Sequence, residues 1–254
     1  MLRRSCDLAI AGLGLLTLAP LIGLILLLIW LQDGRTPLYV APRIGQYGRI
    51  FGMVKIRTMV ARADRSSIYS TAAGDRRVTP LGRLIRRFKL DEVTQLWNVL
   101  KGEMGLVGPR PPVALDVALY SPSERELLEF CPGLTDLASI VFADEGDILR
   151  GSLDPDLDYM QRIRPWKSQI SLLYARRRTL ATDMRVLGLT ALANVRRGAA
   201  LEHAARLLEA MGAPAGLAAV ARRRGELLPV PPPGCEFPIT AADLRFVRQQ
   251  HAVA

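Results

Sequence analysis

Cysteine and histidine are scarce in this chain of 254 residues. Its three cysteines, Cys6, Cys131 and Cys235, are far apart and outside any C-x-x-C spacing, and only His203 and His251 could supply imidazole. This pattern argues against a disulfide framework and against a zinc site, and it fits a reducing compartment.

Positive charge is abundant, but its excess is confined to the first 110 residues. Through Arg110 the chain has 17 Lys/Arg and 7 Asp/Glu, a net charge of +10, whereas the remainder has 17 of each. This distribution predicts an anionic partner, which could be a phosphorylated substrate, an acidic lipid or a nucleic acid. The basic part lacks aromatic stacking platforms and contains a long apolar segment, so a nucleic-acid binder is disfavoured.

The apolar segment runs over residues 8–31, 24 residues without a charge, which is long enough to cross the hydrocarbon core of a bilayer. We therefore predict a membrane segment. A cleaved signal peptide is the competing interpretation because Arg3 and Arg4 make a basic start. The run is too long for a signal peptide, however, and residues 32–35 offer no small-x-small cleavage site.

Two features of the segment favour a re-entrant hairpin over a simple span. Pro20 lies in its middle and frees the carbonyl of Leu16, which needs Thr17, water or neighbouring chain as a partner. Arginines also flank both ends, whereas a single span should concentrate them on the cytoplasmic side. We expect the two ends to emerge on the same face of the membrane.

Short strand patterns follow at residues 37–40 and 51–56, split by a glycine turn, and place Lys55 and Arg57 on one strand face. The polar residues 61–78 predict a mobile loop. Thr79 and Pro80 then start a basic amphipathic helix by N-cap and N1 chemistry. Such a helix could lie on an anionic bilayer or be an ordinary surface helix.

Asp91 and Glu92 lie where one helical pattern ends and another begins. Apolar residues recur at helical spacing over 81–88 and again over 96–100, with basic residues between those of the first pattern. We expect Asp91 to open the second helix, where backbone N–H groups, the helix dipole and the arginines keep its carboxylate ionised. The alternative is that Asp91 is only an N-cap and Glu92 its first-turn companion.

A loop rich in glycine and proline comes next, at residues 105–112. Glycines let the backbone approach a ligand and prolines fix its path, so Arg110 should project from a rigid loop. A planar guanidinium there suits phosphate because it can bind two oxygens at once. A structural turn with an incidental arginine is the alternative. The remainder is predicted to be mixed helix with a break at Pro132, then helices over 199–211 and 215–228 and a short tail.

Taken together, these residues resemble the bacterial sugar transferase family, the monotopic polyprenyl-phosphate phosphoglycosyl transferases. The resemblance follows family order over residues 2–112, with a weaker match to about residue 195. The matching segments are RRSCD at 3–7, the proline-broken apolar run, residues 37–45, KIRTM at 55–59, DRRVTPLG at 75–82, LDE at 90–92, QLWNVLKGEM at 95–104 and GPRP at 108–111. The sequence departs from the family pattern at Ala19, Cys131 and Ser171, which leaves the sugar unidentified.

The resemblance implies a two-step reaction on the cytoplasmic face of the bacterial inner membrane. Asp91 matches the family's nucleophile and would attack the sugar-bearing phosphate of a nucleotide diphosphate sugar, by likeness a uridine one, to leave a phosphosugar-aspartate. A polyprenyl phosphate would then accept the sugar phosphate and so initiate a lipid-linked glycan such as exopolysaccharide, capsule or O-antigen. Mg²⁺ is expected at Asp91, and Glu92 would take the metal or a proton. Charge and positioning dominate phosphoryl transfer, so the expected substrate-binding residues are Lys55, Arg57, Arg86, Pro109, Arg110 and Pro111.

The expected fold is α+β, mainly helical with a few short strands, an N-terminal proline-broken re-entrant membrane helix hairpin and amphipathic interfacial helices. We expect a membrane segment over 1–36, a transferase domain over 37–195 and a helical appendage of unknown role over 196–254. A competing hypothesis is an inactive membrane scaffold of the same family, against which the retention of Asp91, Glu92, Arg86 and Arg110 argues. The sequence leaves open whether the protein forms a homo-oligomer.

Overall fold

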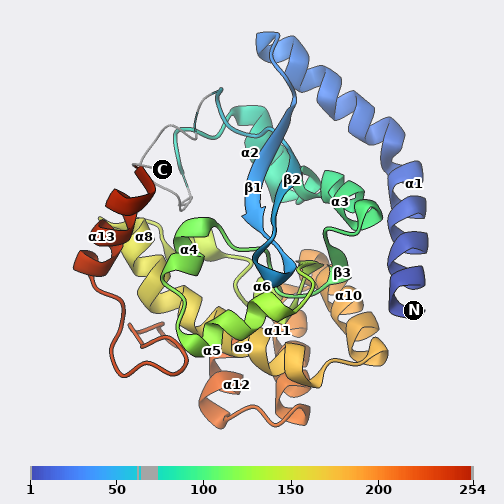
Figure 1. Ribbon diagram of the computed structural model, residues 1–254. Helices are drawn as coiled ribbons and strands as arrows, with labels where there is room; N and C mark the ends of the chain where they lie inside the picture. The colour runs from blue at the N-terminus through green and yellow to red at the C-terminus, as the bar shows by residue number, and fades with distance from the viewer. Residues whose placement is uncertain (1, 62, 64–73, 253–254) are drawn as a thin grey trace.

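The computed structural model describes residues 2–61, 63 and 74–252, so most of the predicted loop over 61–78 lies outside the described residues. The fold is mostly helical with four short strands in the described part, as predicted. Figure 1 shows the arrangement. The elements that form the body after the first helix are β1 (Leu38–Ile44), η1 (Gln46–Gly48), β2 (Ile50–Ile56), α2 (Pro80–Arg87), η3 (Leu90–Gln95), α3 (Leu96–Lys101), β3 (Gly105–Val107), α4 (Ala114–Ala118), α5 (Pro122–Arg125), η4 (Glu126–Glu129), β4 (Gly133–Thr135), α6 (Leu137–Val141), α7 (Glu145–Ile148), α8 (Pro155–Asp158), η5 (Tyr159–Ile163), α9 (Arg164–Arg177), α10 (Leu180–Val195), α11 (Arg197–Ala210), α12 (Ala215–Ala221) and α13 (Ala241–Ala252).

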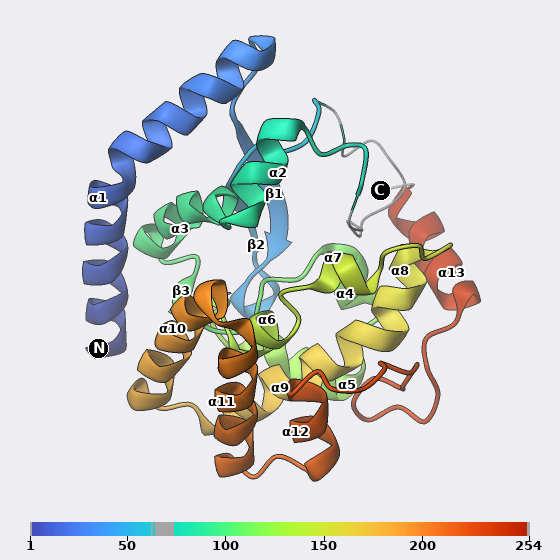
Figure 2. The same cartoon turned by 180° about the vertical axis from the view of Figure 1, so that it is seen from behind.

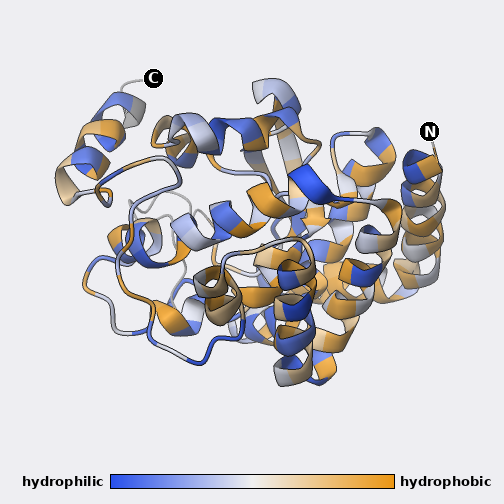
Figure 3. Cartoon of the chain, turned by 90° about the horizontal axis from the view of Figure 1, so that it is seen from below, coloured by the Kyte–Doolittle hydropathy of each residue, from blue (hydrophilic) through white to orange (hydrophobic). Residues whose placement is uncertain are grey.

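The apolar segment is a single helix, α1 (Leu2–Asp33), which bends near its middle (Figures 1 and 2). Pro20 lies inside it, and an internal proline is the usual cause of a helix bend. The Thr17 hydroxyl donates to the carbonyls of Leu13 (2.9 Å) and Gly14 (3.1 Å), not to that of Leu16. Hydrophobic residues cover most of the helix that begins at the N-terminus in Figure 3, and within it only Ala11, Ile25 and Ile29 are buried.

Both ends of α1 are attached to the same body. Near its start, Arg4 donates to the last carbonyls of α3, at Val99 (2.6 Å) and Leu100 (3.0 Å), and so caps that helix. Arg3 forms an ion pair with Asp183 of α10 (2.5 Å). At the far end, Asp33 accepts two hydrogen bonds from the Arg57 guanidinium (2.5 and 2.6 Å). Ile25 and Ile29 pack there in a small hydrophobic cluster with Ile56 and Ile85.

Both predicted strands are present, as the longer β1 and β2, and they pair as an antiparallel hairpin. Side chains of the following helices supply hydrogen-bonding partners to β2: Asn98 accepts from the Val54 N–H (3.0 Å) and donates to the Gly52 carbonyl (2.8 Å). The Thr94 hydroxyl donates to the Val54 carbonyl (3.1 Å). These bonds fix η3 and α3 in register with β2, and they thereby place Lys55 opposite Glu92.

A second, parallel strand pair, β3 with β4, was not predicted. Gly108 and Gly133 meet backbone to backbone just past β3, and a Cβ on Gly133 would lie 2.0 Å from the Gly108 nitrogen. Gly133 N–H donates to the Pro109 carbonyl (2.9 Å), and Gly108 N–H donates to that of Thr135 (3.0 Å). The glycine at 108 therefore allows a close approach to another strand rather than to a ligand, and it fixes the start of the Arg110 loop.

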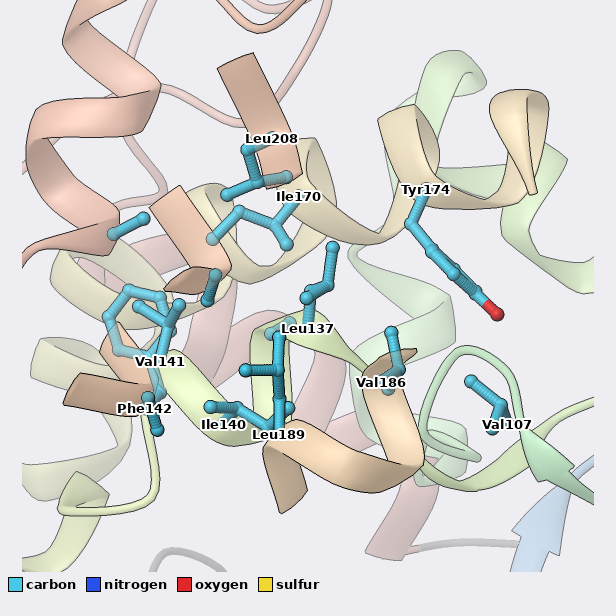
Figure 4. Close-up of a cluster of buried hydrophobic side chains, with 14 of the residues drawn as sticks. Val107, Leu137, Ile140, Val141, Phe142, Ile170, Tyr174, Val186, Leu189 and Leu208 are labelled. Atoms are coloured by element: carbon cyan, nitrogen blue, oxygen red, sulfur yellow. The ribbon is translucent and has the colours of Figure 1, made fainter. Parts of the chain in front are cut away.

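The main hydrophobic core lies between α6, α9, α10 and α11 (Figure 4). Residues of α11 and α12, beyond the predicted boundary at 196, belong to this same core. After α12 the chain crosses the outside of the body: Leu227 O accepts from Arg162 Nε (2.7 Å) and Ile239 O accepts from Gln161 Nε2 (2.6 Å). The last helix, α13, replaces the expected tail, and Arg248 on it pairs with Asp156. The hydrogen bonds of Gln161 and Arg162 attach η5, a π-helical turn, to the chain that follows α12.

Candidate active site

A cavity of about 1210 Å³ lies between the β1–β2 hairpin, η3, the loop after β3, α4, α6 and α9. It is large enough for a nucleotide sugar. Every residue that we predicted for the site lines it: Lys55, Arg57, Arg86, Asp91, Glu92, Pro109, Arg110 and Pro111. The wall also includes Leu18 of α1, so the cavity adjoins the apolar helix.

The prediction that Asp91 opens an α-helix is wrong, because Asp91 lies in a tight 3₁₀ turn. The helix α2 ends at Arg87, and Lys89 then adopts the left-handed conformation (φ 54°, ψ 24°), which is uncommon for a residue with a side chain. The 3₁₀ turn η3 follows, with Asp91 and Glu92 in its first turn, and α3 begins only at Leu96. Non-glycine residues in this conformation concentrate at functional sites.

Glu92 is held by two cations. Its carboxylate pairs with both terminal nitrogens of the Arg110 guanidinium and lies 3.5 Å from Lys55 Nζ. Burial opposes ionisation of Glu92, but the charges of Arg110 and Lys55 outweigh it and hold the pKa of this carboxyl well below its usual range. Burial and the Arg110 charge lower the pKa of Lys55 to about 8. Glu92 is therefore a weak base that is suited to holding Arg110 and Lys55 in place.

Asp91 has a different environment. Burial, reinforced by the neighbouring Glu92 charge, raises the pKa of Asp91 above its usual value, against the opposing effect of Lys55 and Arg86. The prediction that nearby cations keep this carboxylate ionised did not take account of burial, which opposes ionisation. No ion pair to the Asp91 carboxylate occurs among residues 2–61, 63 and 74–252, so its oxygens remain available to react or to bind a metal.

Two of the predicted arginines have partners within the protein. Arg86 donates to the Thr58 hydroxyl (2.8 Å) and remains close enough to Asp91 to favour its ionised form. Arg57 lies just past the end of β2. Its guanidinium is paired with Asp33 and donates to the Thr36 carbonyl (2.9 Å). Arg57 thus anchors the end of α1, although it lines the cavity as well.

The donor set suits Mg²⁺ but not a metal held wholly by protein. In the described ranges, no group of three or more His, Cys, Asp or Glu side chains could hold an ion. Mg²⁺ keeps several waters and is commonly held by one or two carboxylates together with substrate phosphate. Asp91 offers a carboxylate of this kind, whereas Glu92 is engaged by Arg110 and Lys55.

Several polar residues of the cavity wall were not predicted from the sequence. They are Arg43 on β1, Lys89, Asp116 on α4, Tyr159 on η5 and Lys167 on α9. Lys167 pairs with Glu145 (2.8 Å), more than twenty residues away along the chain. Of these residues, Lys89 carried a usable signal, because it lies two positions before Asp91 in the chain.

Comparison with known proteins identifies a family for this chain. The family model described as bacterial sugar transferase matches residues 1–197. UDP-glucose:undecaprenyl-phosphate glucose-1-phosphate transferase of Caulobacter vibrioides is 35% identical over 188 residues, which cover 71% of this chain and 70% of the relative. The exopolysaccharide production protein ExoY of Sinorhizobium fredii is 38% identical over 153 residues, 54% of this chain and 68% of the relative. A putative undecaprenyl-phosphate N-acetylgalactosaminyl 1-phosphate transferase of Bacillus subtilis is 38% identical over 110 residues, 43% of this chain and 62% of the relative.

Proposed function

Because the chain belongs to the bacterial sugar transferase family, we propose that it transfers a sugar 1-phosphate from a uridine diphosphate sugar to undecaprenyl phosphate. The observation that carries the proposal is the pair of carboxylates in the cavity. Glu92 is engaged by Arg110 and Lys55, while Asp91 beside it has no ion pair among the described residues and lies in the field of Lys55 and Arg86. The relatives named above are transferases for undecaprenyl phosphate or act in exopolysaccharide production.

The reaction proceeds in two displacements at phosphorus. An Asp91 oxygen attacks the sugar-bearing phosphate, the bond to the second phosphate breaks, and uridine monophosphate leaves with that bond's electron pair. An oxygen of undecaprenyl phosphate then attacks the aspartyl phosphate, which releases the Asp91 carboxylate and forms undecaprenyl diphosphate sugar. One cation-lined pocket serves both halves, and covalent catalysis divides one difficult transfer into two.

Positioning and charge supply most of the catalysis in phosphoryl transfer. Arg110, held by Glu92, and Lys55 present positive charge beside the nucleophile, and Arg86 adds to it from the last turn of α2. Asp91 would hold Mg²⁺, which when bound neutralises phosphate charge and favours the ionised carboxylate. Pro109 and Pro111 restrict the backbone on either side of Arg110.

The bent helix α1 would lie within one leaflet, as a re-entrant segment on the cytoplasmic face of the inner membrane. Its two ends are bonded to one body, through Arg4 and Asp33, which supports an arrangement with both ends on the same side of the membrane. Large apolar side chains elsewhere on the surface mark the same interface: Leu84, Phe88 and Trp97 are each more than half exposed. The lipid phosphate would then reach the cavity at headgroup depth.

The test is release of uridine monophosphate from labelled donors by membranes that contain the protein, with Mg²⁺ and undecaprenyl phosphate. Donor alone should give a protein heavier by one sugar phosphate in intact-mass analysis. Asp91→Asn should abolish both signals and leave folding and membrane attachment unchanged, whereas Asp147→Asn, an exposed site outside the cavity, should be neutral. Turnover by Asp91→Asn would move the nucleophile elsewhere, and an inert wild-type protein would favour the scaffold hypothesis.

A further inference from the structure

The cavity has a second polar group that the proposed chemistry does not use. It consists of Arg43 on β1, Asp116 on α4, Tyr120, Tyr159 on η5 and Lys167 on α9, all of which line the cavity. These residues come from three parts of the chain, around positions 43, 116–120 and 159–167, and the fold brings them together.

Arg43 is a half-buried cation that has no acidic partner among the described residues. In the described part of the chain no carboxylate forms an ion pair with it, although its strongest charged neighbours are Arg110 and Asp116. Burial and the Arg110 charge lower the pKa of Arg43. Of these two neighbouring guanidinium groups, Arg110 is paired with Glu92, whereas Arg43 has no carboxylate partner within the described ranges. An anion would stabilise such a pair, and a guanidinium suits phosphate.

Asp116 is a half-buried carboxylate to which no residue of the described part of the chain donates a hydrogen bond. Arg164 donates to the backbone carbonyl of Asp116 (3.3 Å), and among the described residues no group donates to its carboxylate. Burial raises the pKa of Asp116 to about 6, against the charges of Arg164, Arg43 and Lys167. Buried carboxylates are stable when they accept hydrogen bonds. A ligand group that donates them, such as a pair of hydroxyls, would satisfy this site, and a phosphate would be repelled.

Two tyrosines of the cavity wall, Tyr120 and Tyr159, are near enough to Asp116 for its charge to raise the pKa of each. Arg164 lies 5.6 Å from the centre of the Tyr120 ring, and Lys167 Nζ lies 5.3 Å from that of Tyr159, so each ring is held by a cation. Flat, rigid aromatic surface of this kind suits stacking with a nucleobase.

The order of charges along the cavity sets the direction of a bound donor. Asp91 is influenced by Lys55 and Arg86, whereas Asp116 is influenced by Arg164 and Arg43. Arg110 interacts with both groups, because it is paired with Glu92 beside Asp91 and its charge acts on Arg43. With the sugar-bearing phosphate at Asp91, the second phosphate reaches Arg110 and Arg43, and the nucleoside lies beyond them.

We propose that Asp116, Tyr120 and Tyr159 form the subsite for the nucleoside of the donor, in which the Asp116 carboxylate accepts hydrogen bonds from the ribose diol and Arg43 binds the departing phosphate. The inference rests on the proposed function. An acidic residue on ribose hydroxyls is a solution that other nucleotide-binding folds also use.

The test measures binding of uridine monophosphate (UMP) and of its 2′,3′-dideoxy analogue to the full-length protein in detergent. The wild type should bind UMP about 10–100-fold more tightly than the analogue, as expected for hydrogen bonds to a charged group. Asp116→Ala should abolish that preference, and Asp116→Asn should retain part of it. Arg43→Ala should weaken both nucleotides and leave the preference intact, while Asp147→Ala should match the wild type.

Two results would overturn the subsite. The first is an Asp116→Ala variant that folds normally and keeps the preference for UMP. The second is an Asp116→Ala variant that binds UMP as tightly as the wild type but has an altered ratio of KM values for UDP-glucose and UDP-galactose. That result would place the transferred sugar, and not the ribose, at Asp116. A wild type that neither binds UMP nor turns over any donor would count against the proposed function instead.

Discussion

Glu92 and Arg110 form an ion pair that joins the turn η3 to the loop after β3. The contact uses both terminal nitrogens of the guanidinium, so it fixes the orientation of Arg110 as well as its position. Lys55 approaches the same carboxylate from β2. Three elements that are distant in the chain thus meet at one carboxylate beside Asp91.

Two replacements of Arg110 should distinguish the contribution of its positive charge from that of its two-nitrogen contact with Glu92. We expect Arg110→Ala to lower kcat/KM for donor turnover by about 10²–10³-fold, the usual effect of removing one group that stabilises transition-state charge. Arg110→Lys should recover only part of that loss, because an ammonium cannot form the two-nitrogen contact with Glu92. The measurement is uridine monophosphate release at several donor concentrations. Equal rates for the lysine variant and the wild type would show that the two-nitrogen contact of the Arg110 guanidinium has no role.

Asp116→Asn should stabilise the fold at high pH and not at low pH. The pKa of Asp116 is raised from 3.8 to about 6, so the folded protein retains a proton that the unfolded chain releases between those values. Stability from this group is therefore present below about pH 4 and is lost as the pH rises through 6. We expect the variant to raise Tm by a few degrees at pH 8 and to leave it almost unchanged at pH 4, since 1 kcal/mol corresponds to roughly 2–4 °C at this size. A lower Tm at pH 8 would contradict the assignment.

Gly133→Ala should destabilise the protein, because the added methyl group would lie 2.0 Å from the Gly108 nitrogen. Overpacking of this kind costs roughly 1–3 kcal/mol. Gly198→Ala, in the first turn of α11, is the matched control: nothing lies within 4 Å of its Cβ position, so it should be neutral or slightly stabilising. Chemical denaturation of both variants in detergent compares them, and equal midpoints would show that the strand pair can open without cost.

The topology of α1 can be tested by single-cysteine labelling in a background without Cys6, Cys131 and Cys235. Cysteines at positions 2 and 40 should react with a membrane-impermeant reagent from the same side, because both ends of α1 are attached to one body. Labelling from opposite sides would require a spanning helix and would rule out the re-entrant arrangement.

Local sequence signals predicted much of the fold. The Thr79 hydroxyl accepts from the Gly82 N–H (2.9 Å) and Pro80 is the first helical residue, as expected, because an N-cap depends only on neighbours in the chain. The β1–β2 hairpin and the long apolar helix followed from alternation and length for the same reason.

Features that depend on distant partners were not predicted. The strands β3 and β4 have three residues each and are recognisable only as a pair. Whether Arg57 faces substrate or Asp33 depends on where α1 ends in space, and the Asp116 environment depends on burial by several elements. The neighbours of Asp91 in the chain suggested a helix start, whereas the left-handed Lys89 produced a tighter turn.

Because α1 is attached to the body at both ends, the depth of α1 in a membrane would also fix the depth of the cavity. A helix fixed at two points cannot slide along the bilayer normal independently of the cavity, so the depth at which it floats sets the height of Asp91 above the lipid phosphates. In the proposed arrangement α1 contacts the lipids of one leaflet only. The activity of the protein should then be indifferent to bilayer thickness, which sorts spanning helices, and sensitive to how tightly the lipids of that leaflet are packed.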